Sequence, residues 1–141
     1  MKKIIDNKSG KSTSLLNKKI NRRISGSKVL INIHTSFNNT IFTVTKENGE
    51  AIFQLSPRKI GFKGARKSTP YASQKTAEMV INQLVELGVS NANIRVKNFG
   101  PGRDSAQRKI ISMQNLIKID SFIDATGIAH GGVRHKRKPS K

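Results

Sequence analysis

The chain has 141 residues, enough for one domain with a single core, and 27 Lys and Arg against 8 Asp and Glu give a formal net charge of +19. It has no cysteine, which excludes a disulfide scaffold, a thiolate zinc site and a catalytic thiol. Its apolar runs are only a few residues long, far short of the roughly 20 needed to cross a bilayer.

Residues 1–28 are predicted to form a basic N-terminal arm. They hold nine Lys and Arg against Asp6 alone, and their apolar residues follow no lasting period. Such a segment is expected to order only on a partner. An import signal is the alternative interpretation, but the arm has only two arginines and no amphipathic repeat. Because the chain starts at Met1, we expect the protein to be made where it works.

Three strands follow the arm and predict an antiparallel meander. Residues 28–34 alternate apolar and polar side chains, and residues 40–46 are rich in β-branched side chains. Residues 36–39 link these two strands as a turn. The Asn48-Gly49 pair predicts a type I′ turn before a third strand over residues 51–55.

The second half of the chain predicts helices that alternate with strands. Thr69 as N-cap and Pro70 at the first position open a helix that Gly88 ends. The inward stripe of this helix comprises Ala72, Thr76, Val80, Leu84 and Leu87. A fourth strand over 93–97, expected to run parallel to a meander strand, a second helix over 103–113 and a fifth strand over 116–123 complete the order βββαβαβ.

This order predicts an α/β fold: a mixed five-stranded sheet with flanking helices on its faces. We assign residues 29–124 to one globular domain. Residues 125–141 carry five Lys and Arg and no acid, and they form a basic C-terminal tail that is too polar to pack.

Two basic ends and one acid-free internal run favour a polyanionic partner over a merely solvated surface, because each uncompensated cation raises self-repulsion in the free protein. The internal run holds Arg58, Lys59, Lys63, Arg66, Lys67 and Lys75. Residues 61–68 nearly match a nucleotide-binding phosphate loop, but Arg66 stands where the second glycine is needed. The glycines and cations that remain, at the start of a helix, predict a site for a backbone phosphate instead.

Catalytic and metal sites find little support in the sequence. The eight carboxylates are scattered, and the three histidines lack metal-ligand spacing. His34, Ser36 and Asp104 could be drawn as a triad, but a chain of this size offers such a trio by chance. We therefore predict a non-enzymatic protein without a cofactor or metal.

Two turns are further candidates for phosphate or base contacts. The Gly100-Pro101-Gly102-Arg103 corner has ordinary turn chemistry, but its glycines could also let main-chain N–H groups reach a phosphate that Arg103 clamps. Phe37 is interpreted more readily as a turn anchor than as a stacking platform. With 5% aromatic residues in the chain, base stacking cannot be the main binding mode.

Three motifs, in the order found here, resemble those of the small-subunit ribosomal protein eleven family of bacterial type. They are residues 33–40 (Ile-His-Thr-Ser-Phe-Asn-Asn-Thr), residues 61–72 (Gly-Phe-Lys-Gly-Ala-Arg-Lys-Ser-Thr-Pro-Tyr-Ala) and residues 100–103 (Gly-Pro-Gly-Arg). The resemblance covers about residues 29–135. It implies a ribonuclease-H-like arrangement and binding to small-subunit ribosomal RNA in the platform, near the messenger exit and E site. It also implies ribosomal proteins seven and eighteen as neighbours, with six and messenger RNA as further candidates.

The chain departs from the family's usual motifs at three places. Residues 57–60 replace a small, Gly-rich stretch, Asn98-Phe99 replaces a second Gly-Pro pair, and residues 130–136 replace a His-Asn-Gly-Cys-Arg-Pro-Pro run. The resemblance implies contacts of the tail with messenger RNA, and residues 130–136 depart from the motif that carries this implication. The Lys, Ile and Asn bias suggests an AT-rich genome, and with the divergent loops it favours an organelle-encoded mitochondrial protein, with a bacterium or plastid as the alternatives.

The sequence thus predicts a structural, RNA-binding constituent of a small ribosomal subunit. The rival is a protein that compacts DNA or binds single strands, which would need a dimerisation face or an aromatic ladder. The predicted RNA-binding residues are Phe37, Asn38, Asn39, Arg58, Lys59, Lys63, Gly64, Arg66, Lys67, Ser68, Gly100, Gly102, Arg103, Arg134, Lys136, Arg137 and Lys138.

Overall fold

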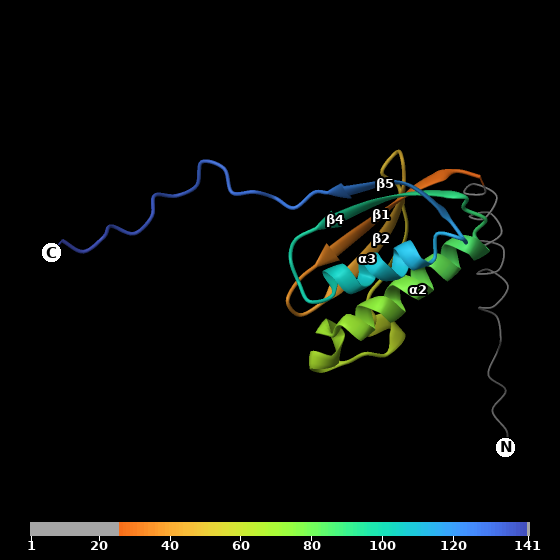
Figure 1. The fold of residues 1–141 in the computed structure, drawn as a ribbon, viewed down its shortest axis with the longest axis horizontal. Helices are drawn as coiled ribbons and strands as arrows, with labels where there is room; N and C mark the ends of the chain where they lie inside the picture. The colour runs from red at the N-terminus through yellow and green to blue at the C-terminus, as the bar shows by residue number, and fades with distance from the viewer. Residues whose placement is uncertain (1–25, 141) are drawn as a thin grey trace, which may run out of the picture.

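The computed structural model describes residues 26–140, which form a five-stranded sheet and two α-helices (Figure 1). The elements are β1 (Lys28–Thr35), β2 (Thr40–Lys46), β3 (Ala51–Leu55), α2 (Pro70–Glu86), β4 (Asn91–Lys97), α3 (Arg103–Ser112) and β5 (Lys118–Asp124). The predicted order βββαβαβ is confirmed. Two short 3-10 helices that the sequence did not predict, η1 (Pro57–Ile60) and η2 (Gly64–Ser68), lie between β3 and α2. Of the predicted N-terminal arm, residues 1–25 lie outside the described residues.

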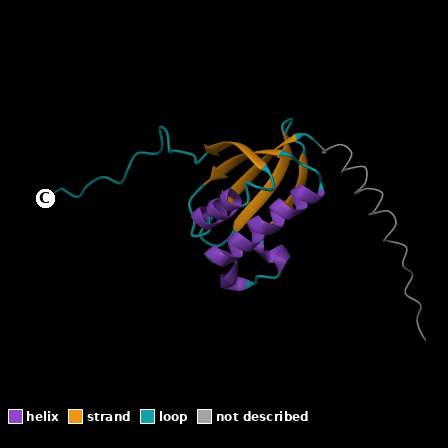
Figure 2. Cartoon of the chain, turned by 45° about the vertical axis from the view of Figure 1, so that its right-hand side comes forward, coloured by secondary structure: helices purple, strands orange, loops and turns teal. Residues whose placement is uncertain are grey.

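The sheet is mixed, as predicted, with the strand order β3-β2-β1-β4-β5. β2 is antiparallel to β1 and β3, whereas β4 is parallel to β1 and β5. Both crossovers, through α2 and through α3, run in the same direction across the sheet. Right-handed crossovers in one direction place their helices on one side. Accordingly α2 and α3 pack against each other on the same face of the sheet, and among residues 26–140 no helix covers the other face (Figure 2).

The core lies between the sheet and these helices. Alternate residues of β1 (Val29, Ile31 and Ile33) are fully buried toward the helices. On α2 the predicted stripe is confirmed from Ala72 to Leu84, while Leu87 at the helix end is half-buried. The buried face of α2 is wider than predicted, since Ser73, Ala77 and Ile81 are buried too.

The ends of α2 follow from capping chemistry. The hydroxyl of Thr69 accepts a hydrogen bond from the N–H of Ala72 (3.3 Å), and Pro70 occupies the first helical position. Gly88 has a φ of 72°, a left-handed conformation in which glycine is favoured, and it ends the helix as predicted.

The β2–β3 hairpin and the start of β5 differ from prediction. A type I′ turn needs positive φ at both central residues, but of the pair only Gly49 has it (87°), so that prediction is wrong. The N–H of Gly49 bonds to the carbonyl of Lys46 (3.0 Å), which is the pattern of a three-residue loop with a glycine bulge. Strand β5 begins at Lys118 because the N–H of Leu116 still closes a turn onto the carbonyl of Met113 (3.0 Å).

Candidate nucleic-acid interface

The basic loop, defined as residues 57–68, connects β3 to α2 and is built from the two 3-10 helices. Pro57 is buried at the first position of η1 and fixes the loop to the body. Gly61, with a φ of 107°, ends η1, and its N–H bonds to the carbonyl of Arg58 (3.2 Å). The ring of Phe62 meets that of Tyr71 edge to face, with centroids 6.1 Å apart, which ties the loop to the start of α2. The loop is therefore a defined structure, although it contains no strand or α-helix.

This fold brings most of the predicted loop residues together. Arg58, Lys63, Gly64 and Lys67 line one surface hollow, and Lys63 and Arg66 contribute to a neighbouring one. Lys59 points elsewhere, since its Nζ donates to the carbonyl of Gln54 (2.6 Å).

Charge in the basic loop is uncompensated. Neither 3-10 helix has an acidic residue in its first turn. Within residues 26–140, none of the cations at 58, 63, 66 and 67 forms an ion pair with a carboxylate. The predicted Ser68 donates its hydroxyl to the carbonyl of Ala65 (2.8 Å). The loop therefore presents a cluster of unpaired cations to solvent, the arrangement that an anion would neutralise.

The predicted turn after β1 is closed by its own residues. The N–H of Ser36 bonds to the carbonyl of Asn39 (2.8 Å), and the N–H of Asn39 bonds to the hydroxyl of Ser36 (3.1 Å). Phe37 is 78% exposed, so the interpretation of its ring as a turn anchor is wrong. Asn38 is exposed, and the buried Oδ1 of Asn39 has no hydrogen-bond partner among the described residues. The turn thus presents one aromatic ring and one amide to solvent and leaves a second amide oxygen unsatisfied.

The Gly100–Arg103 corner packs directly beneath this turn. A Cβ built on Gly100 would lie 2.5 Å from the carbonyl oxygen of Ser36. A Cβ on Gly102 would overlap the hydroxyl oxygens of Thr40 and Ser73, which contact each other at 2.9 Å. The lack of side chains at Gly100 and Gly102 therefore lets other parts of the protein pack closely against the corner. An approach of their N–H groups to a phosphate stays a prediction.

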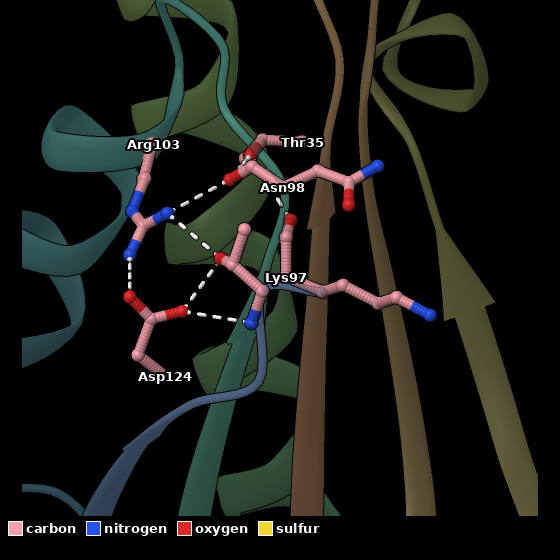
Figure 3. A network of polar contacts seen from close by, with 6 residues as sticks. Thr35, Lys97, Asn98, Arg103 and Asp124 are labelled. Atoms are coloured by element: carbon pink, nitrogen blue, oxygen red, sulfur yellow. Dashed lines mark hydrogen bonds and ion pairs between the residues drawn. The ribbon is translucent and has the colours of Figure 1, made fainter. Parts of the chain in front are cut away.

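Arg103 is held by an internal network (Figure 3). Its Nη2 lies 2.6 Å from Oδ2 of Asp124, and its Nη1 donates to the carbonyl of Asn98 (2.9 Å) and the hydroxyl of Thr126 (3.2 Å). The guanidinium also lies over the ring of Phe99, 5.2 Å from the centroid. With its side chain only 16% exposed, Arg103 holds the end of β5 to the β4–α3 corner. In this structure the charge of Arg103 is paired with Asp124. Binding of a phosphate by Arg103 stays a prediction.

Two residues that the sequence analysis noted only as departures complete this corner. Asn98 has a φ of 66°, a left-handed conformation that glycine adopts freely and that Asn tolerates better than most other residues. Phe99 is 67% exposed beside the network. The presence of Asn98-Phe99 in place of the family's Gly-Pro pair was the sequence signal that could have suggested an exposed aromatic ring at this corner.

The C-terminal tail leaves the body at the network. The N–H of Ala125 still bonds to the carbonyl of Val96 (2.8 Å), and beyond Thr126 the chain extends away from the domain without helix or strand (Figure 1). The four predicted cations of the tail, Arg134, Lys136, Arg137 and Lys138, are all exposed.

The network predicts an acid-dependent contribution to stability. Hydrogen bonds from the hydroxyl and N–H of Thr126, followed by that from Arg103, lower the pKa of Asp124 from its usual 3.8 to about 2. A carboxylate with a lowered folded pKa stabilises the fold above its unfolded pKa and loses that contribution as the pH falls through the folded pKa. We expect the unfolding free energy to fall between about pH 4 and pH 2, and to fall less steeply in Asp124→Asn.

Urea unfolding at each pH would measure both curves. The pKa values of Glu78 and Asp120 are also lowered, by Lys75 and by Lys28 respectively. Because Glu78 and Asp120 are unchanged in Asp124→Asn, the difference between the wild-type and variant curves reports the contribution of Asp124 to the unfolding free energy. Parallel curves for the wild type and the variant would contradict this role of Asp124.

Within the described part of the chain, no group of three or more His, Cys, Asp or Glu side chains is arranged to hold a metal ion. The same residues contain no helix of the length and apolar character that a membrane span requires.

Comparison with known proteins gives one consistent result. The family model described as ribosomal protein S11 matches residues 29–140. A Chromobacterium violaceum protein named small ribosomal subunit protein uS11 is 43% identical over 116 residues, which are 82% of this chain and 87% of that protein. Proteins of the same name from Azoarcus sp. and Neisseria meningitidis serogroup C are 40% and 39% identical, over 91% and 90% of this chain and 96% and 94% of their own lengths.

Proposed function

Because this chain belongs to the ribosomal protein S11 family, whose members are structural and non-enzymatic, we propose that it is a constituent of the small ribosomal subunit that binds small-subunit ribosomal RNA. One observation carries the RNA-binding part of this proposal. The basic loop is a defined structure, and among the described residues its cations at 58, 63, 66 and 67 have no carboxylate partner.

The mechanism is neutralisation of phosphates. Lys and Arg side chains displace the counterions of the RNA, and the folded body fixes where those side chains point. Because double-helical RNA hides its base edges in a deep major groove, we expect the protein to recognise the shape of a folded junction rather than a base sequence. The exposed cations of the tail extend this mechanism beyond the domain, and the tail orders as it runs between RNA strands.

The location within the subunit is part of the proposal. The resemblance of residues 33–40, 61–72 and 100–103 supports a place in the platform, near the E site and the messenger exit. It also supports ribosomal proteins seven and eighteen as neighbours, with protein six and messenger RNA as further candidates. The exposed rings of Phe37 and Phe99 fit such a crowded site, since each offers an aromatic face to a partner.

The compartment is proposed on composition. The Lys, Ile and Asn bias favours a mitochondrial, organelle-encoded protein, with the bacterial cytoplasm or a plastid as the alternatives. The relatives described above are bacterial, which fits either an organelle or a bacterium. Fractionation of source cells with detection of the protein would separate these cases.

Sedimentation of the tagged full-length protein tests the proposed function. We expect it to co-migrate with small subunits after a high-salt wash, because a folded RNA–protein assembly holds its components through many simultaneous contacts. Protein that stays at the top of the gradient would contradict the proposal.

A further inference from the structure

We propose that the uncovered face of the sheet is a second RNA-binding surface, which contacts the sugar-phosphate backbone through Arg95 and Lys97. This inference rests on the proposed function and extends it to residues that the sequence analysis did not select. We define the open face as the side of the sheet opposite α2 and α3.

Strand alternation determines which residues lie on the open face. On β4, Ala92, Ile94 and Val96 are buried toward the helices, so Arg95 and Lys97 point the other way, and both are exposed. The register brings further polar residues beside these cations. On β1, Arg95 lies opposite Asn32 and Lys97 lies opposite His34, whereas on β5 the neighbour of Arg95 is Ile123.

The composition of the open face does not fit a covering helix or a protein core. Such an occupant would require a continuous apolar face. On the three central strands the face instead carries Lys28, Asn32, His34, Thr43, Thr45, Asn91, Asn93, Arg95 and Lys97, with only Leu30 and Ile41 as apolar members. Neutral hydrogen-bonding side chains around a pair of cations suit a hydrated, anionic backbone.

Charge is segregated along the open face. Within the described residues, Arg95 and Lys97 form no ion pair or side-chain hydrogen bond. The carboxylates lie toward the opposite end, where cations accompany them: Asp120 pairs with Lys28 (2.8 Å), and Glu50 pairs with Lys46 (2.8 Å). The end that carries the unpaired Arg95 and Lys97 is therefore the one complementary to a phosphate backbone.

The cationic end is continuous with the turn that the sequence had already selected. The hydroxyl of Thr35 donates to the carbonyls of Lys97 (3.2 Å) and Asn98 (2.9 Å), which joins the ends of β1 and β4. In Figure 3 the side chains of Lys97 and Asn98 extend across β1, away from the network of Arg103 and Asp124. An RNA strand that passes the exposed ring of Phe37 would reach this end of the sheet next.

The chemistry of the open face indicates backbone contacts rather than base stacking. None of its residues on β1, β2 and β4 is aromatic, and stacking platforms require aromatic rings. Arg95 and Lys97 are two residues apart on one strand, about 7 Å at the Cα atoms by the usual rise of a strand. Their side chains can therefore reach neighbouring phosphates, while Asn and Thr side chains can bond to ribose hydroxyls.

The test compares Arg95→Gln/Lys97→Gln with wild-type protein in binding to a transcript of the small-subunit ribosomal RNA central domain, across a salt titration. Loss of two phosphate contacts should reduce the slope of log affinity against log salt by about 2 and lower the affinity about 50-fold at 0.1 M salt. The matched control is Arg108→Gln, an exposed arginine on α3 that has no ion-pair partner in the described residues. Because this control loses one charge, it is compared with the single variant Arg95→Gln. We expect Arg108→Gln to change the affinity less than twofold.

The arms of this experiment separate the two proposals. A third variant replaces the basic-loop cations Arg58, Lys63, Arg66 and Lys67 with glutamine. If this variant weakens binding while Arg95→Gln and Arg108→Gln have equal effects on affinity, the open-face inference is wrong and the proposed function stands. If the wild-type protein does not bind the transcript, the proposed function itself fails.

A second readout reports proximity directly. Because the chain has no cysteine, single cysteines give unique attachment points for an iron chelate that generates hydroxyl radicals. Thr43→Cys places the probe on the open face, and Ser112→Cys places it at the end of α3. We expect localised cleavage of the bound transcript from position 43 and little from position 112. Equal cleavage patterns from both positions would overturn the inference.

Discussion

Neutralising the basic loop will weaken binding to small-subunit ribosomal RNA about 10³-fold at 0.1 M salt. The variant replaces Arg58, Lys63, Arg66 and Lys67 with glutamine. Each phosphate contact contributes about 0.9 to the salt slope, so each lost contact costs up to about eightfold at 0.1 M relative to 1 M salt, and four contacts multiply. The four cations line adjoining hollows and have no carboxylate partner among the described residues, so their removal takes away attraction without breaking an internal ion pair.

Filter binding or fluorescence anisotropy over a salt range would measure this effect. If about 6–10 phosphates are neutralised in total, the wild-type affinity should fall ~10³–10⁵-fold between 50 and 200 mM salt, and the variant should respond less steeply. A matched control compares Arg66→Gln/Lys67→Gln in the loop with Arg108→Gln/Lys109→Gln on α3, so that each variant loses two positive charges. Equal losses in the two variants would mean that net charge, not the loop, drives binding, and a flat wild-type salt response would rule out neutralisation altogether.

Gly102→Ala will destabilise the fold by about 3 kcal/mol, which corresponds to a melting temperature lower by roughly 10–20 °C. The φ of Gly102 is −86°, which alanine adopts freely, so the effect is steric and not conformational. The added methyl group would overlap the hydroxyls of Thr40 and Ser73 and would lie 2.9 Å from the Cβ of Ser73. Both neighbours are fully buried between β2 and α2, so they have no space in which to move aside.

Thermal or urea unfolding would measure the loss, and two further variants define its cause. Gly127→Ala adds the same methyl group where nothing lies within 4 Å, and its melting temperature should stay within about 2 °C of wild type. Adding Ser73→Ala to Gly102→Ala removes the nearest obstructing atom and should restore part of the lost stability. A Gly102→Ala protein as stable as wild type would show that the corner is not tightly packed.

Local patterns predicted the elements of the fold well, because their signals are carried by neighbouring residues. Alternation in 28–34 and in 40–46, and the Thr69-Pro70 start of a helix, need no distant partner to be interpreted. Two connections between these elements were not predicted in this way. The hairpin at Asn48-Gly49 forms a bulged loop, and residues 57–68 form two 3-10 helices that the edge-to-face pair of Phe62 and Tyr71 ties to α2.

The candidate site shows the same division. The cations of the basic loop were predicted from an acid-free run, and the structure gathers them as expected. Gly102 and Arg103 were selected for phosphate contacts, but one packs on Ser73 and the other pairs with Asp124. Asp124 lies 21 residues along the chain from Arg103, and sequence spacing alone offers no means of pairing them.

Composition and local periodicity alone established a basic, cysteine-free chain with strands and helices in a set order and with cations concentrated in one loop and at the ends. Three short motifs added the resemblance to the S11 family. Which of these charges remain available to a partner depends on the folded arrangement. It removed Arg103 by pairing it with Asp124, and it exposed Arg95 and Lys97 by placing both helices on the opposite face of the sheet. The physical reason is that a charge is free or neutralised according to what lies within a few ångströms of it in space, and chain folding sets that distance.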